Sequence, residues 1–158
     1  MDDTKKKDLT YFFPAFVVWL LAFLIPSFWN LQAPILTLKS PMDIAGTSIF
    51  IAGFLIRVVA QATLKRNYSG TLRIREGHQL ITHGIYKHVR HPVYTGVILS
   101  ALAIPIYTTS LPGLLIALLG IPLFNYRIGA EEKMLINEYG DQYTEYMKTT
   151  SKLIPHIY

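Results

Sequence analysis

The distribution of apolar residues along the chain limits what this sequence can fold into. Apolar residues dominate four stretches separated by polar or basic segments, namely 11–29, 43–64, 93–107 and 111–126. A helix needs about 20 apolar residues to cross a bilayer, so the last two stretches are slightly short and would have to tilt or thin the bilayer. With 51% hydrophobic and 16% charged residues, the chain is too apolar for an ordinary soluble domain. The sequence predicts a single all-α integral membrane domain, residues 1–158, with about four transmembrane helices.

The first apolar stretch has a competing interpretation as a signal peptide, because Lys5, Lys6 and Lys7 precede it. Its length exceeds that of a typical signal core, and it lacks a small-x-small cleavage motif. We therefore expect it to stay in the protein as a membrane span.

Positive charge lies almost entirely on one side of the predicted arrangement. All but Lys39 and Arg57 of the 15 Lys and Arg fall in the N-terminal tail, the loop 65–92 or the segment 127–158. Four spans put these segments on the same side, and the positive-inside rule makes that side cytoplasmic. We expect both termini in the cytoplasm, and the net charge of +5 to face anionic lipid rather than nucleic acid. Arg57, inside the second span, either snorkels to the interface or acts within the bundle.

Helix packing and turns can also be anticipated. Gly46 and Gly53 are seven residues apart in the second span, so they share a face suited to close helix packing. The uncharged turn 108–110 joins the last two stretches into a helical hairpin. In the long loop, the alternation of Leu72–Arg75 predicts a short extended strip.

The loop runs into the third stretch through His91 and Pro92. A residue before proline avoids the helical conformation, and proline suits the first turn of a helix. The bend therefore predicts a helix start whose free N–H groups favour an anionic group.

The segment after residue 126 is polar. Its apolar and aromatic residues Leu135, Tyr139, Tyr143 and Tyr146 would share one face of a helix that Gly140 weakens. We expect an interfacial helix with its aromatic residues at headgroup level.

Arg127 and Glu131, four residues apart, are an ordinary surface pair if taken alone. A helical hairpin, however, brings its two cytoplasmic ends together. The His91–Pro92 bend and a turn over Arg127–Glu132 should therefore converge and enclose a charged pocket beside the lipid.

Several kinds of chemistry are excluded or weakly supported. The chain has no cysteine, which excludes disulfides and thiol catalysis. Glycine-rich nucleotide loops, GxSxG and HExxH are absent. The long loop contains four histidines, His78, His83, His88 and His91. Their spacing is not helical, and Glu76 is the only carboxylate beside them, so no metal site is predicted.

Two segments carry a combined motif, which reads His78-x-Leu80-Ile81-x-x-Gly84-Ile85-Tyr86-x-x-x-Arg90-His91-Pro92-x-Tyr94-x-Gly96 and then Arg127-x-x-x-Glu131-Glu132-x-x-Leu135-x-x-x-Tyr139-Gly140-x-x-Tyr143-x-x-Tyr146. This motif resembles that of the isoprenylcysteine carboxyl methyltransferase family, and it covers the chain from His78 to its end. The first half of the chain matches the family only in hydropathy and helix count.

The resemblance implies S-adenosylmethionine as methyl donor and a membrane-embedded, lipophilic or lipidated acceptor. It implies that Arg127 holds the substrate beside the transferred methyl group. The cofactor contacts that it implies come from the loop, the bend and the fourth helix: His78, Gln79, Leu80, Ile81, Tyr86, His91, Pro92, Val93, Tyr94 and Glu131.

The acceptor stays open at this point, because similarly built relatives include phospholipid N-methyltransferases and small-thiol S-methyltransferases. A carboxylate is ionised at neutral pH and needs no general base, whereas an amine or a thiol needs a proton acceptor. The alternative outside enzymology is a membrane protein whose histidine loop binds a metal ion or a partner.

Overall fold

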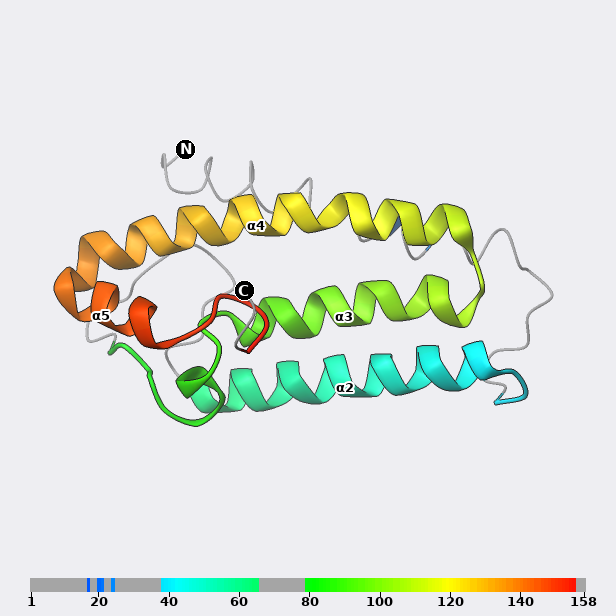
Figure 1. Ribbon diagram of the computed structural model, residues 1–158, viewed down its shortest axis with the longest axis horizontal. Helices are drawn as coiled ribbons and strands as arrows, with labels where there is room; N and C mark the ends of the chain where they lie inside the picture. The colour runs from blue at the N-terminus through cyan, green and yellow to red at the C-terminus, as the bar shows by residue number, and fades with distance from the viewer. Residues whose placement is uncertain (1–16, 18–19, 22–23, 25–37, 66–78, 156–158) are drawn as a thin grey trace.

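A computed structural model describes residues 17, 20, 21, 24, 38–65 and 79–155 of the chain. Its elements are α2 (Pro41–Leu64), the short 3-10 helix η2 (Gly84–Lys87), α3 (Pro92–Tyr107), α4 (Leu111–Tyr139) and α5 (Asp141–Thr149). Figure 1 shows α3 lying between α2 and α4, with α5 and η2 at one end of these three helices. The elements among the described residues are therefore all helical, as predicted.

Three sequence-based predictions fall on other parts of the chain. Most of the predicted first span, 11–29, lies outside the described residues, although Val17, Leu20, Leu21 and Leu24 are helical. The predicted extended strip at Leu72–Arg75 and the candidate ligand His78 also lie outside them.

Helix α2 begins at a well-defined N-terminal cap. The Ser40 side chain accepts a hydrogen bond from the Asp43 backbone N–H, and the Asp43 carboxylate accepts one from the Ser40 backbone N–H. Such a reciprocal pair satisfies two donors that a helix start leaves free. Of the described helices, α2 and α4 are long and apolar enough to cross a membrane, while α3 is a shorter apolar helix of 16 residues.

The predicted glycine face of α2 packs against α3. A Cβ atom at Gly46 would lie 2.6 Å from the Tyr107 Cβ, and one at Gly53 would lie 2.8 Å from the Gly96 carbonyl oxygen. These contacts leave no room for a side chain, so the two backbones approach closely, as small residues allow in membrane helices. The pairing also makes α2 and α3 antiparallel, because the start of α2 meets the end of α3.

The predicted hairpin between α3 and α4 is present, but α4 is longer than expected. Ser110 caps α4 by accepting a hydrogen bond from the Gly113 N–H at 3.2 Å. The helix then runs for 29 residues to Tyr139, so the prediction of a turn over Arg127–Glu132 is wrong. The reason is local, because residues 130–136 are mostly strong helix formers and none of them interrupts the backbone.

Gly140 does more than weaken the helix: it ends α4. Its φ of +55° is a left-handed conformation that glycine adopts without strain. The chain turns there into α5, whose Tyr143 and Tyr146 side chains are only 1% and 9% exposed. The prediction that these tyrosines share a continuous helix face with Leu135 and Tyr139 is therefore wrong, since the turn separates α5 from α4 and folds them into the protein. Their position at headgroup level stays a prediction.

After α5, residues 150–153 form a C-terminal strap along the loop that leads into α3. Val89 and Ser151 form a parallel bridge, and the His91 N–H donates to the Lys152 carbonyl oxygen at 3.1 Å. The Thr95 hydroxyl donates to the Leu153 carbonyl oxygen at 2.8 Å. These contacts therefore tie the start of α3 to the segment that follows α5.

Candidate active site

A tyrosine hydroxyl joins α3 to α4 at the polar end of the bundle. Arg127 Nε donates to the Tyr94 hydroxyl oxygen at 2.8 Å, and that hydroxyl donates to Glu131 Oε2 at 2.8 Å. Tyr94 lies half a turn into α3, and Arg127 and Glu131 lie one turn apart on α4. The predicted convergence of the His91–Pro92 bend with Arg127 and Glu131 is thus present, although the second segment is a helix.

The start of α3 follows its prediction. His91 has a non-helical backbone, with φ −124° and ψ 56°, and Pro92 occupies the first helical position. Both side chains are buried. The His91 ring meets the Tyr94 ring edge to face, with centroids 5.9 Å apart, so the bend and the first turn form one unit.

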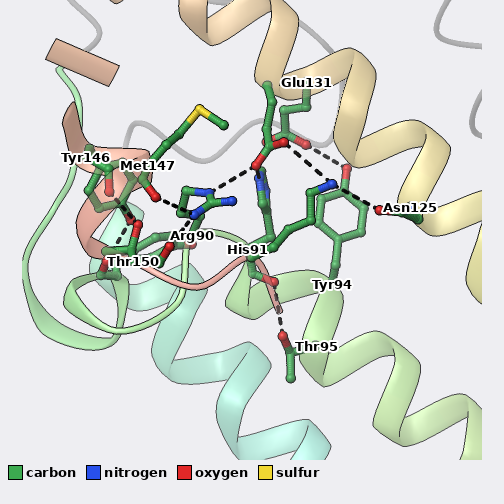
Figure 2. A network of polar contacts seen from close by, with 12 residues as sticks. Arg90, His91, Tyr94, Thr95, Asn125, Glu131, Tyr146, Met147 and Thr150 are labelled. Atoms are coloured by element: carbon green, nitrogen blue, oxygen red, sulfur yellow. Dashed lines mark hydrogen bonds and ion pairs between the residues drawn. The ribbon is translucent and has the colours of Figure 1, made fainter. Parts of the chain in front are cut away.

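Glu132 is the centre of a second, more buried network. Its Oε1 accepts from Arg90 Nε at 3.0 Å and lies 3.2 Å from His91 Nε2, while its Oε2 lies 3.6 Å from Lys152 Nζ. The Glu132 side chain is 10% exposed. One carboxylate therefore binds the loop, the bend and the C-terminal strap to α4, as Figure 2 illustrates for Arg90 and His91.

Arg90 extends this network to α5. Its Nη1 donates to the Met147 carbonyl oxygen at 3.1 Å and also to the Thr150 carbonyl oxygen. Figure 2 shows Arg90 beside Met147 and Thr150. The end of α5, which has free carbonyl groups, is a favourable place for a cation. Arg90 therefore fixes α5 against the loop.

Two tyrosines of α5 are buried beside this network. The Tyr146 hydroxyl donates to the Tyr86 carbonyl oxygen at 2.6 Å, and burial raises the pKa of Tyr146 to about 12. Burial, reinforced by the charge of Glu132, also raises the pKa of Tyr143. Both phenols therefore stay neutral at physiological pH and can act as hydrogen-bond donors.

The structure brings together five of the predicted site residues: His91, Pro92, Tyr94, Arg127 and Glu131. Tyr86 joins them indirectly, through the hydrogen bond of its carbonyl group with Tyr146.

The remaining predicted contacts lie at the edges of this group. Val93 is partly buried within the first turn of α3, Gln79 is exposed, and Leu80 and Ile81 are partly buried before η2. Their role as cofactor contacts stays a prediction.

Sequence reasoning assigned no role to Arg90, Glu132, Lys152 and Asn125. Glu132 stands next to Glu131, and Arg90 next to His91, so the motif contained the first two. The Lys152 Nζ, which donates to Asn125 Oδ1 at 3.1 Å, had no such signal, because its partners lie on α4 and are far away in the sequence. For metal binding, the described residues contain no group of three or more His, Cys, Asp or Glu side chains that could hold an ion.

The fold and the site together define a class: a helical membrane protein with a buried polar network where a loop, the start of one helix and the end of another meet. The sequence profile of the Isoprenylcysteine carboxyl methyltransferase (ICMT) family matches residues 46–137. This chain belongs to that family.

Individual relatives agree with this assignment. The Protein-S-isoprenylcysteine O-methyltransferase of Tribolium castaneum is 31% identical over 124 residues, which cover 71% of this chain and 41% of the relative. The probable Protein-S-isoprenylcysteine O-methyltransferase of Oryza sativa subsp. indica is 32% identical over 115 residues, covering 71% of this chain and 60% of the relative. The chain thus spans about half of the length of these relatives.

The fold resembles that of a solved structure, the eukaryotic intramembrane Ras methyltransferase ICMT. The TM-score is 0.73 with 27% sequence identity, over 92% of this chain and 52% of that one. The chain is therefore a homologue of an intramembrane protein, with two candidate membrane-spanning helices among its described residues.

Proposed function

We propose that this protein is an S-adenosylmethionine-dependent methyltransferase that esterifies the carboxylate of an isoprenylated cysteine at the membrane. The observation that carries the proposal is the chain of hydrogen bonds from Arg127 through the Tyr94 hydroxyl to Glu131. It sets a cationic group and a carboxylate one helical turn apart, in a member of a family named for carboxyl methylation.

The residues of the site fit the proposed methyl donor. Glu131 is partly exposed, and its Oε2 is held by Tyr94. A carboxylate held in this way can accept a hydrogen bond from an ammonium group or a ribose hydroxyl. The His91 ring packs edge to face on the Tyr94 ring, and the Tyr94 hydroxyl holds Glu131. S-adenosylmethionine, when bound, supplies a methyl group already activated on a sulfonium, so the protein has to align the reactants and exclude water.

Arg127 is the residue that we assign to the acceptor. A planar guanidinium matches the geometry of a carboxylate, and Arg127 is 7% exposed, which strengthens its electrostatic interactions. The acceptor carboxylate is ionised at neutral pH and needs no general base. Arg127 therefore orients the nucleophile, while the Tyr94 hydroxyl holds the guanidinium in place.

We also propose the topology and the route of the acceptor. Four spans with both termini in the cytoplasm would put this network at the inner leaflet, because the basic segments would face anionic lipid. A prenyl chain is apolar and dissolves in the bilayer, so an isoprenylated acceptor would enter sideways between helices. The charged donor would enter from the cytoplasm.

The test is methyl transfer by the purified protein in lipid nanodiscs. The protein is incubated with methyl-tritiated S-adenosylmethionine and one of three acceptors: N-acetyl-farnesylcysteine, phosphatidylethanolamine or a small alkyl thiol. We expect label in farnesylcysteine, released as methanol by base, since a methyl ester is base-labile. Farnesylcysteine amide, which lacks the carboxylate, should stay unlabelled.

The other acceptors distinguish the remaining interpretations. Base-stable label in the amine lipid or in the thiol, with none in farnesylcysteine, would replace the proposed acceptor while keeping the methyl donor. Absence of label in all three, together with no affinity for the donor, would contradict the enzymatic proposal as a whole.

A further inference from the structure

One buried polar group is not explained by the networks described above. Tyr143 is 1% exposed, and its hydroxyl has no hydrogen-bond partner within the described part of the chain. A buried hydroxyl without a partner loses its hydration and gains nothing in return. Because native proteins satisfy the large majority of such groups, each exception calls for an explanation.

The surroundings of this hydroxyl are those of the candidate site. The charges of Glu132, Arg90 and Glu131 all act on it. Its ring lies 5.8 Å from that of Tyr146, centroid to centroid, and Tyr146 in turn binds the carbonyl group of Tyr86. Tyr143 is thus enclosed by residues of α4, the loop and α5 that form the site.

Tyr146 shows what packing alone would require. Three residues along the same helix, it is also buried, but its hydroxyl has a partner at 2.6 Å. If Tyr143 served packing only, phenylalanine would fill the same volume without burying an unsatisfied hydroxyl. The hydroxyl of Tyr143 is therefore a group whose partner is expected to arrive with a ligand.

The chemistry of the neighbours narrows the ligand group. Two carboxylates, Glu132 and Glu131, and one cation, Arg90, act on the Tyr143 hydroxyl. Because negative charge is in excess there, a neutral oxygen suits this hydroxyl better than an anionic one. A ribose hydroxyl can accept from a phenol and donate to a carboxylate at the same time. We propose that the Tyr143 hydroxyl donates a hydrogen bond to a ribose hydroxyl oxygen of the bound methyl donor. This inference rests on the proposed function, and it adds a cofactor contact from α5.

The test measures binding and stability separately, without turnover. Calorimetry with S-adenosylhomocysteine in detergent is expected to give about tenfold weaker affinity for Tyr143→Phe than for the unmodified protein, the size of one lost hydrogen bond. 5′-Methylthioadenosine, which keeps the ribose and lacks the amino acid, should also bind Tyr143→Phe about tenfold more weakly than it binds the unmodified protein. A 2′,3′-dideoxy analogue of S-adenosylhomocysteine, which lacks both ribose hydroxyls, should bind both proteins equally.

Thermal unfolding of the ligand-free proteins supplies the control. Tyr143→Phe should leave the unfolding midpoint unchanged or raise it, because it removes a buried hydroxyl without a partner. Tyr146→Phe should lower the midpoint, because it breaks a hydrogen bond present in the structure.

Three results would overturn the inference. The first is equal affinity of Tyr143→Phe and the unmodified protein for S-adenosylhomocysteine. The second is an about tenfold difference between the two proteins that persists with the dideoxy analogue, and the third is an unfolding midpoint of Tyr143→Phe as low as that of Tyr146→Phe. If the unmodified protein itself bound no S-adenosylhomocysteine, the proposed function would fail along with the inference, whereas the three results above leave it intact.

Discussion

The Tyr94 hydroxyl lies between two charged residues, Arg127 and Glu131, that have different hydrogen-bonding capacities. Arg127 donates to it and Glu131 accepts from it, each at 2.8 Å. Because a guanidinium carries five N–H donors, Arg127 can hold Tyr94 and still address an acceptor carboxylate. Glu131 can accept from a cationic or hydroxylated ligand. The two residues should therefore fail in different ways when they are changed.

Arg127→Ala should impair use of the acceptor more than binding of the donor. Loss of a charge-assisted interaction with the acceptor carboxylate predicts a fall in kcat/KM for farnesylcysteine of about 10 to 100-fold. The affinity for S-adenosylhomocysteine should change much less. Steady-state kinetics and calorimetry on the same preparation measure the two, and Lys133→Ala, an exposed cation on the same helix, is the matched control. Equal loss of both quantities would show that Arg127 binds the donor or is structural.

Glu132→Ala should destabilise the protein strongly. Glu132 meets Arg90, His91 and Lys152 in a site where its side chain is 10% exposed. Removing one partner leaves the others buried without compensation, which costs about 3 kcal/mol or more in the free energy of unfolding.

The matched control for Glu132→Ala is Glu145→Ala, whose carboxylate pairs with Lys148 where both side chains are more than two-thirds exposed. Such a surface pair contributes little, so denaturant unfolding in detergent should separate the two variants clearly. Similar small losses in both would show that the Glu132 network does not hold the loop, strap and α4 together.

At this scale, the sequence could predict that Arg127 and Glu131 would meet the bend at His91, because a helical hairpin brings its ends together. It could not predict that Glu132 contacts the loop, the bend and the C-terminal strap. Its partner Lys152 comes from a strap whose path depends on the turn at Gly140, and Arg90 reaches the carbonyls of Met147 and Thr150 for the same reason.

At the scale of elements, the close approach of α2 and α3 depends on glycine. A Cβ atom at Gly53 would lie 2.8 Å from the Gly96 carbonyl oxygen and 2.9 Å from the Ser100 hydroxyl oxygen. Gly53→Ala should therefore push the helices apart and cost about 1–3 kcal/mol in the free energy of unfolding.

Gly129→Ala is the control for this contact. Apart from its two chain neighbours and the nearby backbone of its own helix, no described residue has a heavy atom within 4 Å of the position that its Cβ would take. Alanine favours a helix over glycine by roughly 0.5–1 kcal/mol. This variant should be slightly more stable than the unmodified protein in denaturant unfolding. A Gly53→Ala variant as stable as Gly129→Ala would contradict the close packing of α2 on α3.

Hydropathy alone is not sufficient to predict where every helix begins and ends. The start of α2, the hairpin turn and the bend at Pro92 follow from capping residues, turn residues and proline. The end of α4 does not follow from hydropathy, because the apolar residues stop near Tyr126 while the helix formers continue to Tyr139. The burial of Tyr143 and Tyr146 depends on the turn at Gly140, which periodicity alone treats as a weak point in one helix.

At the scale of the whole molecule, the proposed orientation can be tested on a chain that has no cysteine. Thr109→Cys puts a thiol in the exposed hairpin turn, and Lys148→Cys puts one on the exposed side of α5. The proposed topology predicts that a membrane-impermeant maleimide labels intact cells at position 109. Position 148 should react only after the cells have been permeabilised. The reverse labelling pattern would show the opposite orientation in the membrane, in which a cytoplasmic donor could not reach the site.

We propose that the start of α3 and the polar end of α4 bind S-adenosylmethionine together. Calorimetry of the intact protein with S-adenosylhomocysteine tests this binding, with Glu131→Ala and Glu138→Ala compared under the same conditions. Glu138 is an exposed carboxylate on the same helix, so it controls for charge alone. We predict binding by the unmodified protein and by Glu138→Ala, and at least tenfold weaker binding by Glu131→Ala. No binding by the unmodified protein, or the same affinity in Glu131→Ala, would contradict a donor site shared by α3 and α4.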